Sequence, residues 1–429
     1  MKFSIFTPVH KMNEGYLNDL FDSLVAQSYD QDFEWLVVLN GSITDGEWND
    51  WIATKQDYNF TTSWFWSDTT GNVGQLKKQA CEQASGKICI ELDWDDMLTP
   101  DALQELDNAF ADPDVVFAYS NSAQFEDQTW VAERAGKYPY SGYWGWNKRR
   151  TEYKGHSLWE MVAFEPTAHS IRRIEWAPNH VRAWRKDAYL AIGGHDADIA
   201  LGDDHDLVCK FYIAYGQKGF AHIDKCIYIY RAHTENTCKV RNGEVQQQVG
   251  KNYNKYINDL ATRWATDNGL RKLDLGGRFN AWKGYETVDL LDADIVIDLN
   301  EDWDDIPDNS VGVIKAYHII EHLKDPIHFF NEAYRVLAPG GFLLIEVPST
   351  NGIGAWCDPT HISFFNTHSF EYYTNEKYGR FIRPMYKGRF QKARVVEYWW
   401  TEPKLPVVRA ELICLKDEYK IKHVGEILM

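Results

Sequence analysis

The sequence predicts an α/β protein of two domains, each with a largely parallel sheet between helices. The chain has 429 residues, of which 44% are hydrophobic and 25% charged. This exceeds one ordinary domain and allows a buried core in each half. Short apolar runs alternate with segments of helical periodicity in the first half, and the alternation restarts at Lys272 after a polar helical stretch.

The elements of the first half follow from their apolar periodicity. Strands are expected at 3–9, 33–39, 60–66, 88–92 and 115–119. Helices are expected at 14–26, 46–56, 73–84, 100–111 and 207–215. Strands that alternate with helices in this order form a mostly parallel sheet.

The second half repeats this organisation. We expect a first domain at 1–242, a connecting helix at 243–268 and a second domain at 269–429. In the second domain a strand at 272–275 ends in glycines, and an acidic residue ends the next strand. The further strands are expected at 287–289, 295–299, 313–316, 342–347, 393–399 and 407–415.

Charge and cysteine content exclude several classes of protein. A net charge of −18 argues against a nucleic-acid or anionic-membrane binder, because both need basic surfaces. The seven cysteines form no C-x-x-C pair, so reduced thiols and a cytoplasmic setting are expected. No window reaches the length of a membrane span and the N-terminus lacks a signal sequence, so we expect a soluble protein without stable membrane insertion.

The stretch Glu91-Leu92-Asp93-Trp94-Asp95-Asp96 follows a short apolar run. If the strand continues, alternation sends Asp93 and Asp95 to the same side, where two carboxylates suit Mg²⁺ or Mn²⁺. The alternative is that Asp95 and Asp96 begin a turn or cap the helix near Pro100.

Four motifs in order give this stretch a context. They are Thr7-Pro8-Val9-His10, then Asn40-Gly41-Ser42 with Asp45-Gly46, then Gly71-Asn72, then Gly86 leading to the acidic stretch. This series resembles the family 2 glycosyltransferases of the GT-A fold. The resemblance implies a nucleotide-diphosphate sugar donor, with Mn²⁺ or Mg²⁺ bridging its phosphates. It implies donor contacts from Thr7, Pro8, Asn40, Asp45, Asn72, Lys78 and Asp93, and metal ligands Asp93, Asp95 and His233.

The resemblance also implies a catalytic base. After Gly193-Gly194 comes Gly202-Asp203-Asp204-His205-Asp206, and the second acid of this pair, Asp204, takes the position of the base in that family. An inverting transfer needs one carboxylate to receive the proton of the acceptor hydroxyl. For Asp203 and Asp206 we expect N-capping of the following helix.

An acceptor platform is predicted between residues 125 and 184, where aromatic residues are dense. Aromatic rings stack on the apolar faces of sugars, so a glycan or glycolipid acceptor is expected. The alternative for any single ring is a place in a small core. The residues concerned are Trp130, Tyr138, Tyr140, Tyr143, Trp144, Trp146, Tyr153, Trp159, Trp176 and Trp184.

The second half resembles the Rossmann-like class I S-adenosylmethionine-dependent methyltransferases. The motifs are Leu273-Asp274-Leu275-Gly276-Gly277, the segment from His318 to Leu323, and Pro339-Gly340-Gly341. The segment Asp358-Pro359-Thr360-His361 looks like a branch acting on sugars. The resemblance implies contacts to S-adenosylmethionine from Asp274, Gly276, Gly277, Asp289, Asp298 and His318, with His361 as a proton acceptor.

One position departs from the methyltransferase pattern. Arg278 stands where a second glycine is usual, and its side chain is expected to crowd the methionine end of the cofactor. The predicted function is therefore a bifunctional enzyme of polysaccharide biosynthesis that transfers a sugar and methylates one. Its first alternative is an active glycosyltransferase with a silent methyltransferase-like module. Two others are a carbohydrate-binding platform and a metal-dependent phosphohydrolase in the first half.

Overall fold

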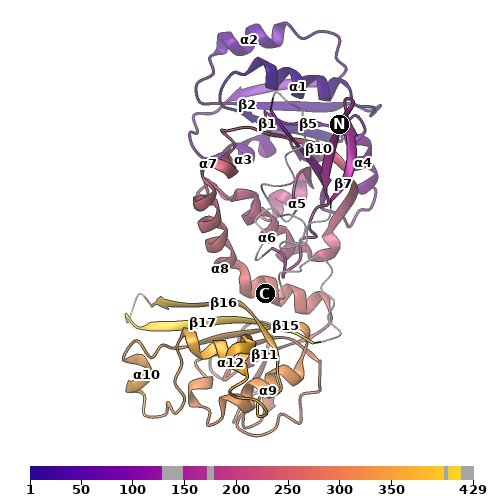
Figure 1. Ribbon diagram of the computed structural model, residues 1–429. Coiled ribbons are helices and arrows are strands. Elements are labelled where there is room, and N and C mark those ends of the chain that lie inside the picture. Colours follow the sequence, from indigo (N-terminus) through magenta and orange to yellow (C-terminus); the bar gives the residue numbers. More distant parts are fainter. Residues whose placement is uncertain (128–147, 172–177, 401–403, 417–429) are drawn as a thin grey trace. The chain divides into compact units, whose positions relative to one another are not determined.

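The computed structural model describes residues 1–127, 148–171, 178–400 and 404–416. The chain divides into two compact units, the first formed by Met1–Ile257 and the second beginning at Asn258 (Figure 1). Both are mixed α/β, as the sequence predicts. Among the helices of the described residues, none has an apolar stretch that could cross a membrane.

The first unit is organised around a ten-stranded sheet. Its order is β3-β2-β1-β4-β9-β6-β10-β5, and β8 pairs with β6 and β7. The strands β3, β2, β1 and β4 are parallel, whereas β9 is antiparallel to both of its neighbours. The bounds are β1 (Phe3–Val9), β2 (Phe33–Leu39), β3 (Thr61–Trp66), β4 (Ile88–Glu91), β5 (Met97–Leu98), β6 (Phe117–Glu126), β7 (Lys148–Tyr153), β8 (His156–Met161), β9 (Arg182–Arg185) and β10 (Phe220–Ala232).

Helices cover both faces of the parallel strands. Figure 1 shows α1 and α2 on one side of β1 and β2, with α3 on the other. Trp35 on β2 and Trp48 on α2 are both fully buried, and their rings meet with centroids 6.1 Å apart, which removes apolar surface from water. The bounds are α1 (Glu14–Val25), α2 (Asp45–Ala53), α3 (Val73–Gln83), α4 (Ala102–Ala109), α5 (Lys186–Ala191), α6 (Asp203–Tyr215), η1 (Gln217–Gly219), α7 (Thr237–Val240) and α8 (Asn242–Asp267).

Two local predictions for the first half are wrong. The strand β4 ends at Glu91, and the following residues turn, with the Asp96 N–H donating to the Asp93 carbonyl at 3.1 Å. Strand alternation therefore does not place Asp93 and Asp95. The helix α6 already begins at Asp203 with Gly202 as its N-cap, so Asp203 lies in the first turn and does not cap. The same holds for Asp206.

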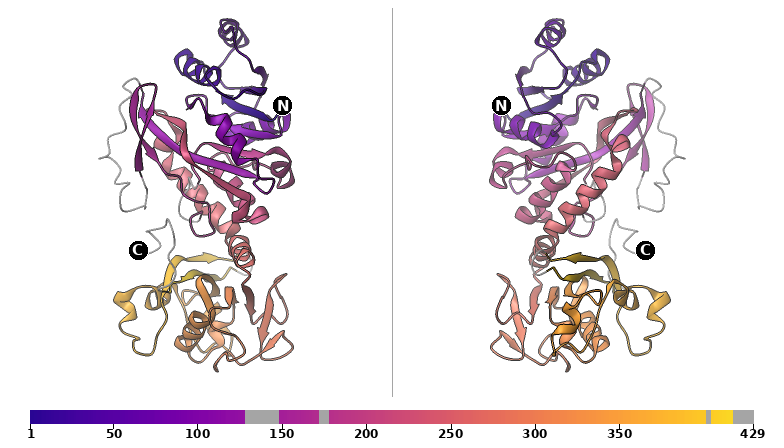
Figure 2. Two further views of the ribbon diagram at one scale, coloured as in Figure 1. Left: turned by 90° about the vertical axis from the view of Figure 1, so that its right-hand side faces the viewer. Right: turned by 90° about the vertical axis from the view of Figure 1, so that its left-hand side faces the viewer.

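The second unit contains a seven-stranded sheet of order β13-β12-β11-β14-β15-β17-β16. It is parallel as far as β15, and β17 and β16 are antiparallel, as expected from the sequence. Figure 2 shows these last two strands side by side in both views. The bounds are β11 (Arg271–Leu275), β12 (Glu286–Asp289), β13 (Ile295–Val296), β14 (Val311–Tyr317), β15 (Leu337–Pro348), β16 (Phe390–Trp399) and β17 (Pro406–Cys414).

Short helices surround this sheet, and its core includes the fully buried Trp303, Phe329 and Phe330. The strand expected at 295–299 is only two residues long, and β15 begins earlier than expected, with a register shift relative to β14. The unit boundary falls within α8. The bounds are η2 (Ile320–His322), α9 (Pro326–Val336), α10 (Gly354–Cys357), η3 (Thr367–Phe370), α11 (Glu371–Thr374) and α12 (Glu376–Gly379).

Candidate functional site

A buried network of charges lies in the first unit around Glu91, the last residue of β4. Arg182 on β9 is its partner in the sheet register, so both side chains lie on one face. Arg182 Nε is 3.2 Å from Glu91 Oε2, and Lys77 Nζ on α3 is 2.6 Å from Glu91 Oε1. A buried carboxylate is costly unless it is paired, so the two cations make this Glu91 position possible.

The start of α6 completes the network. Arg182 Nη1 is 2.5 Å from Asp204 Oδ2, and Lys77 Nζ is 3.1 Å from Asp203 Oδ2. Gly74 on α3 permits this approach, because a Cβ there would stand 3.0 Å from the Asp203 Cβ. Two helices and two strands thus meet at one cluster of opposite charges.

The two acids at the start of α6 differ in access and in pKa. The Asp203 side chain is 8% exposed and that of Asp204 is 29% exposed. Burial raises the pKa of Asp203. Burial acts in the same direction on Asp204, but Arg182 and Lys77 outweigh it and lower its pKa to about 2. Asp204 is therefore the ionised carboxylate that a ligand can reach.

The acidic turn after β4 faces two imidazoles. Asp93 Oδ2 is 3.8 Å from His180 Nε2, and Asp95 Oδ2 is 2.6 Å from His233 Nε2. Burial raises the pKa of Asp93, and the nearby carboxylates of Glu91 and Asp95 act in the same direction. His180 and Lys77 oppose this rise but do not cancel it. Ligand atoms of Glu91, Asp93 and His180 lie within 4.8 Å of one another. This cluster shares only Asp93 with the predicted ligands, and in it Glu91 is already paired with Lys77 and Arg182. The other two predicted ligands, Asp95 and His233, do lie together, and a carboxylate beside an imidazole suits Mn²⁺.

Asp96 has a structural role beside this turn. Its Oδ2 accepts a hydrogen bond from the Tyr228 hydroxyl at 2.7 Å, and its Oδ1 accepts from the Arg231 N–H at 2.7 Å. The Tyr228 ring stacks on His180 with centroids 4.8 Å apart. The turn and His180 are therefore held by β10.

The residues predicted to contact the donor have different surroundings. Thr7 is buried, and its Oγ1 accepts from Trp35 Nε1 at 3.1 Å, while Pro8 follows it on β1. Asn40 Nδ2 donates to the Thr69 carbonyl at 3.0 Å, and its buried Oδ1 has no hydrogen-bond partner in the described parts of the chain. A buried amide oxygen without a partner is uncommon, and this one lies just after the carboxyl end of β2.

Three other residues predicted to contact the donor lie at helix ends or on helix surfaces: Asn72, Lys78 and Asp45. Asn72 caps α3 by accepting from the Gln75 N–H at 2.9 Å, and it donates to the Ala197 carbonyl. Asp45 is exposed at the start of α2, and Lys78 is half-buried. Within the described part of the chain, neither Asp45 nor Lys78 forms an ion pair. The lysine that pairs with Glu91 is Lys77, which is adjacent to Lys78.

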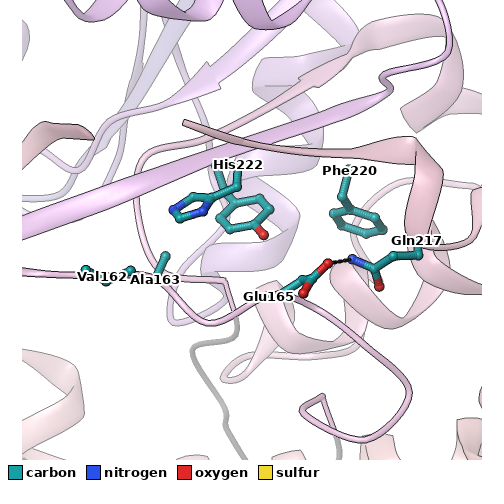
Figure 3. A pocket seen from close by; sticks show the side chains of 7 residues that line it. Val162, Ala163, Glu165, Gln217, Phe220 and His222 are labelled. Carbon is teal, nitrogen blue, oxygen red and sulfur yellow. Dashed lines mark hydrogen bonds between the residues drawn. The ribbon is translucent and has the colours of Figure 1, made fainter. Parts of the chain in front are cut away.

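A pocket of about 270 Å³ lies on the same face of the sheet. The register runs from Arg182 through Tyr119 on β6 to His222 on β10, so these side chains share that face. His222 stacks on Tyr119 with centroids 4.9 Å apart. Figure 3 shows the Glu165 carboxylate accepting from Gln217 Nε2 at 2.8 Å beneath these rings. The pocket combines flat aromatic faces with an amide and a carboxylate.

The predicted aromatic platform is only partly described. Trp184 and Tyr153 are buried and belong to the core, which was the alternative interpretation. Trp159 is half-buried, and Arg150 lies over its ring at 3.8 Å from the centroid. Outside the described residues lie Trp130, Tyr138, Tyr140, Tyr143, Trp144, Trp146 and Trp176.

In the second unit the glycine turn after β11 is tightly packed. Gly276 has φ +73°, and a Cβ there would stand 3.1 Å from Ile319 Cδ1. A Cβ on Gly277 would stand 2.7 Å from Asp274 Cγ. Asp274 is buried, and its Oδ2 lies 3.1 Å from Lys315 Nζ and accepts from the Trp282 N–H at 3.0 Å. Asp274 thus holds the turn in place from inside.

The other predicted cofactor contacts follow neighbouring strands. Asp289 ends β12 and is half-buried, and Asp298 is exposed beyond β13. His318 follows β14 with φ +53°, a conformation that is unusual for a residue with a side chain and often marks a functional site. Burial lowers the pKa of His318, but Glu321 and Glu346 outweigh it and raise the pKa to about 9.

Arg278 lies beside the glycine turn and is engaged elsewhere. Its guanidinium forms an ion pair with Asp292 and lies over the Phe279 ring, 4.9 Å from the centroid.

Residues 4–177 match the family model described as glycosyl transferase family 2, and residues 278–345 match a methyltransferase domain. The chain joins a family 2 glycosyltransferase domain to a methyltransferase domain. A probable S-adenosylmethionine-dependent methyltransferase of Mycolicibacterium smegmatis is 46% identical over 44 residues. This match covers 10% of the chain and 17% of the relative.

Several solved structures resemble this chain at low sequence identity. S. aureus TarS in complex with UDP-GlcNAc has a TM-score of 0.43 and 16% identity, covering 62% of this chain and 71% of that one. The mannosyltransferase PcManGT of Pyrobaculum calidifontis, in complex with GDP-Man and Mn²⁺, has a TM-score of 0.39 and 14% identity. It covers 62% of this chain and 73% of that one.

Four residues of the glycosyltransferase site were not predicted from sequence: Lys77, Glu91, His180 and Arg182. Glu91 stood next to the predicted metal ligands, and a charge at the end of an apolar strand was a usable signal for it. Arg182 begins β9 and His180 stands two residues before it, in the part of the chain where only an aromatic platform was predicted, so nothing local indicated their role.

Proposed function

We propose that the first unit transfers a sugar from a nucleotide-diphosphate sugar to a glycan or glycolipid acceptor, with inversion at the anomeric carbon. The observation that carries this proposal is the Asp204 carboxylate, which Arg182 holds at 2.5 Å beside the acidic turn and which remains reachable. A binding platform has no need of such a carboxylate. Asp93, Asp95 and His233 would hold Mn²⁺ or Mg²⁺, which neutralises the charge of the departing diphosphate.

In the proposed reaction the acceptor hydroxyl oxygen attacks the anomeric carbon while the bond to the diphosphate breaks. The hydroxyl proton passes to Asp204. A carboxylate with a pKa of about 2 is a weak base towards a resting hydroxyl. The hydroxyl becomes strongly acidic as its oxygen gains the new bond, so transfer is concerted with attack. The ion pair with Arg182 contributes by fixing the carboxylate orientation.

We assign the donor and acceptor to different parts of the sheet. The unpartnered Asn40 Oδ1 would accept a hydrogen bond from the donor's base. The pocket of Tyr119, His222 and Gln217 would take a sugar ring of the acceptor, because aromatic faces and a paired amide and carboxylate match a ring with one apolar face and several hydroxyls.

Donor binding is tested by thermal shift with a panel of nucleotide sugars, with and without Mn²⁺. Wild-type protein should be stabilised only by one class of donor together with the ion, and Asp95→Ala should lose that stabilisation. The matched control is Asp50→Ala, an exposed acid on α2. Stabilisation of Asp95→Ala equal to that of wild type would place the ion elsewhere.

The base is tested by turnover. Asp204→Asn keeps the shape but removes the proton acceptor, so the rate should fall about 10²- to 10⁴-fold with donor affinity unchanged. Full activity in this variant, or a product that retains the donor's anomeric configuration, would contradict the assignment.

For the second unit we propose transfer of a methyl group from S-adenosylmethionine to a sugar hydroxyl, most simply on the glycan that the first unit extends. Bound S-adenosylmethionine supplies an electrophilic methyl group on its sulfonium. The turn at Gly276 would face the cofactor's methionine end, Asp289 its ribose hydroxyls and Asp298 its adenine, with His318 beside them. The role of His361 as a proton acceptor stays a prediction.

Domain limits, location and cofactor binding belong to the same proposal. We assign 1–242 to sugar transfer, 243–268 to a connecting helix and 269–429 to methyl transfer, in a cytoplasmic enzyme of polysaccharide biosynthesis. Tethering two activities raises the concentration of one product at the next site.

Calorimetry of the full chain with S-adenosylmethionine and with its demethylated product tests the second unit. Absence of heat with both would favour the silent module that Arg278 suggests.

A further inference from the structure

Three potential metal ligands of the second unit meet at the carboxyl ends of its parallel strands. Glu321 and His322 lie in η2 just after β14, and His361 lies in the segment after β15. One ligand atom of each lies within 4.8 Å of the other two. The Ile362 and Ser363 N–H groups both donate to the Glu321 carbonyl at 2.9 Å, which fixes the two segments against each other.

The Glu321 carboxylate is buried without the partners that such a group needs. Its side chain is 3% exposed, and among the described residues neither carboxylate oxygen has a hydrogen-bond partner. The nearest cation is His318, whose Nδ1 lies 3.4 Å from Oε1. A buried carboxylate normally collects several hydrogen bonds or a metal ion. One carboxylate oxygen is therefore left to be satisfied by something that binds.

The two imidazoles are oriented as metal ligands are. His361 Nδ1 is 3.1 Å from the Ala355 carbonyl, and His322 Nδ1 is 3.3 Å from the Thr360 carbonyl and 3.0 Å from its hydroxyl. A carbonyl oxygen only accepts, so each Nδ1 carries the hydrogen. This leaves the lone pair of each ring on Nε2. A backbone carbonyl on the far nitrogen is the usual support of a metal-binding histidine.

We propose that Glu321, His322 and His361 bind a divalent transition-metal ion of the zinc type. Two imidazoles and one carboxylate form a ligand set that zinc accepts while keeping a further position open for water or substrate. Asp358 Oδ2 lies 3.8 Å from His361 Nε2 and is the candidate for an additional ligand. This site is separate from the acidic turn of the first unit.

The place of the ion gives it a role that rests on the proposed methyl transfer. Ile319, two residues before Glu321, packs against the glycine turn at Gly276. An ion here stands next to the expected cofactor and would bind the acceptor hydroxyl. It would lower the pKa of that hydroxyl, so the proton leaves to water as the oxygen attacks the methyl carbon and the sulfur retains the bonding electrons. His361 would then act as a ligand.

Zinc binding by the full chain tests the proposal independently of any activity. Protein stripped with a chelator is titrated with Zn²⁺ against a competing indicator, and bound metal is counted by mass spectrometry. Wild type should bind one tight equivalent. His322→Ala and His361→Ala should each lose it, with affinity weakened more than about 100-fold. Zn²⁺ should raise the melting temperature of wild type but not that of these variants.

Three control variants test whether the loss of zinc is specific to the proposed ligands. Cys357→Ser removes the exposed thiol four residues before His361, His368→Ala removes an exposed histidine on η3, and Asp95→Asn removes a proposed metal ligand of the first unit. All three should keep the tight equivalent. Unchanged zinc affinity in His361→Ala, or loss of the ion in Cys357→Ser, would overturn the proposal. If the metal-free variants have the same melting temperature as metal-free wild type, their fold is intact.

Calorimetry with S-adenosylmethionine separates this inference from the proposed function. If His361→Ala loses zinc and still binds the cofactor, both stand. If wild type binds the cofactor but not zinc, only the metal site fails.

Discussion

The two candidate sites of this chain are held together by different forces. The glycosyltransferase site is centred on buried charges, in which Lys77 and Arg182 neutralise Glu91 and the acids that begin α6. The methyltransferase site is centred on a glycine turn whose backbone is fixed by close packing, with its charged Arg278 paired at the surface. A charge network should fail when one member is removed. The glycine turn should instead tolerate changes of its surface charges, although not of the buried Asp274 that pairs with Lys315, and should resist any added Cβ.

The largest effect is expected from breaking the buried network. Lys77→Met removes the cation of the buried Asp203 and one of the two cations beside Glu91, and should destabilise the first unit by about 3–5 kcal/mol. The matched control is Lys78→Met, the half-buried neighbour, whose effect should stay within about 0.5 kcal/mol. Urea unfolding measures both. Equal effects would mean that the network contributes nothing specific.

The methyltransferase unit also contains a buried charge that should affect its stability. Burial raises the pKa of Glu346, but hydrogen bonds from His318, Tyr398 and Arg409 outweigh it and lower the pKa from 4.5 to about 2. A lowered folded-state pKa stabilises the protein above pH 4.5, and this contribution is lost as pH falls through about 2. Wild type should lose about 3 kcal/mol across that range from this group.

Glu346→Gln should therefore flatten the acid limb of the stability curve between pH 4.5 and pH 2. Unfolding free energies measured at several pH values check this, with the exposed Glu376→Gln as the control. A steep limb that survives in Glu346→Gln would assign the acid sensitivity to other carboxylates.

A smaller effect is expected from adding a Cβ to the glycine turn. Gly276→Ala places a side chain at φ +73° and 3.1 Å from Ile319 Cδ1, so it should cost about 2 kcal/mol and weaken S-adenosylmethionine binding. Gly284 has φ +81° with nothing within 4 Å of the added atom. Gly284→Ala should cost about 1 kcal/mol and leave cofactor affinity unchanged. Calorimetry and thermal unfolding distinguish contact from backbone strain.

The smallest effect is expected from Arg278. Its ion pair with Asp292 is at the surface, and such pairs contribute at most about 1 kcal/mol. Arg278→Gly should change stability by no more than this and leave cofactor affinity within about threefold of wild type. A large gain in affinity would show that the side chain obstructs the cofactor. Asp292→Asn, which frees Arg278 without removing it, is the control.

The sequence by itself determined the two α/β domains and most of their parallel strands, because hydrophobic periodicity is a local property and β1 and β2 have the bounds it predicts. It also located the acidic turn and Asp204, since these motifs are contiguous. It failed where the chain leaves regular structure. Asp93 and Asp95 lie in a turn, and although His233 was predicted beside Asp95, His180, which lies beside Asp93, was not.

Only the tertiary structure decided which charges are paired. Lys77 and Lys78 are adjacent and chemically alike, yet the face of α3 that packs on the sheet buries Lys77 alone. Arg182 reaches Glu91 only because β9 inserts antiparallel beside β4, a pairing between strands 91 residues apart. The cluster of Glu321, His322 and His361 likewise depends on two loops that meet at one sheet edge. Such contacts are fixed by packing and by the need to compensate buried charge, and neither is visible in local sequence.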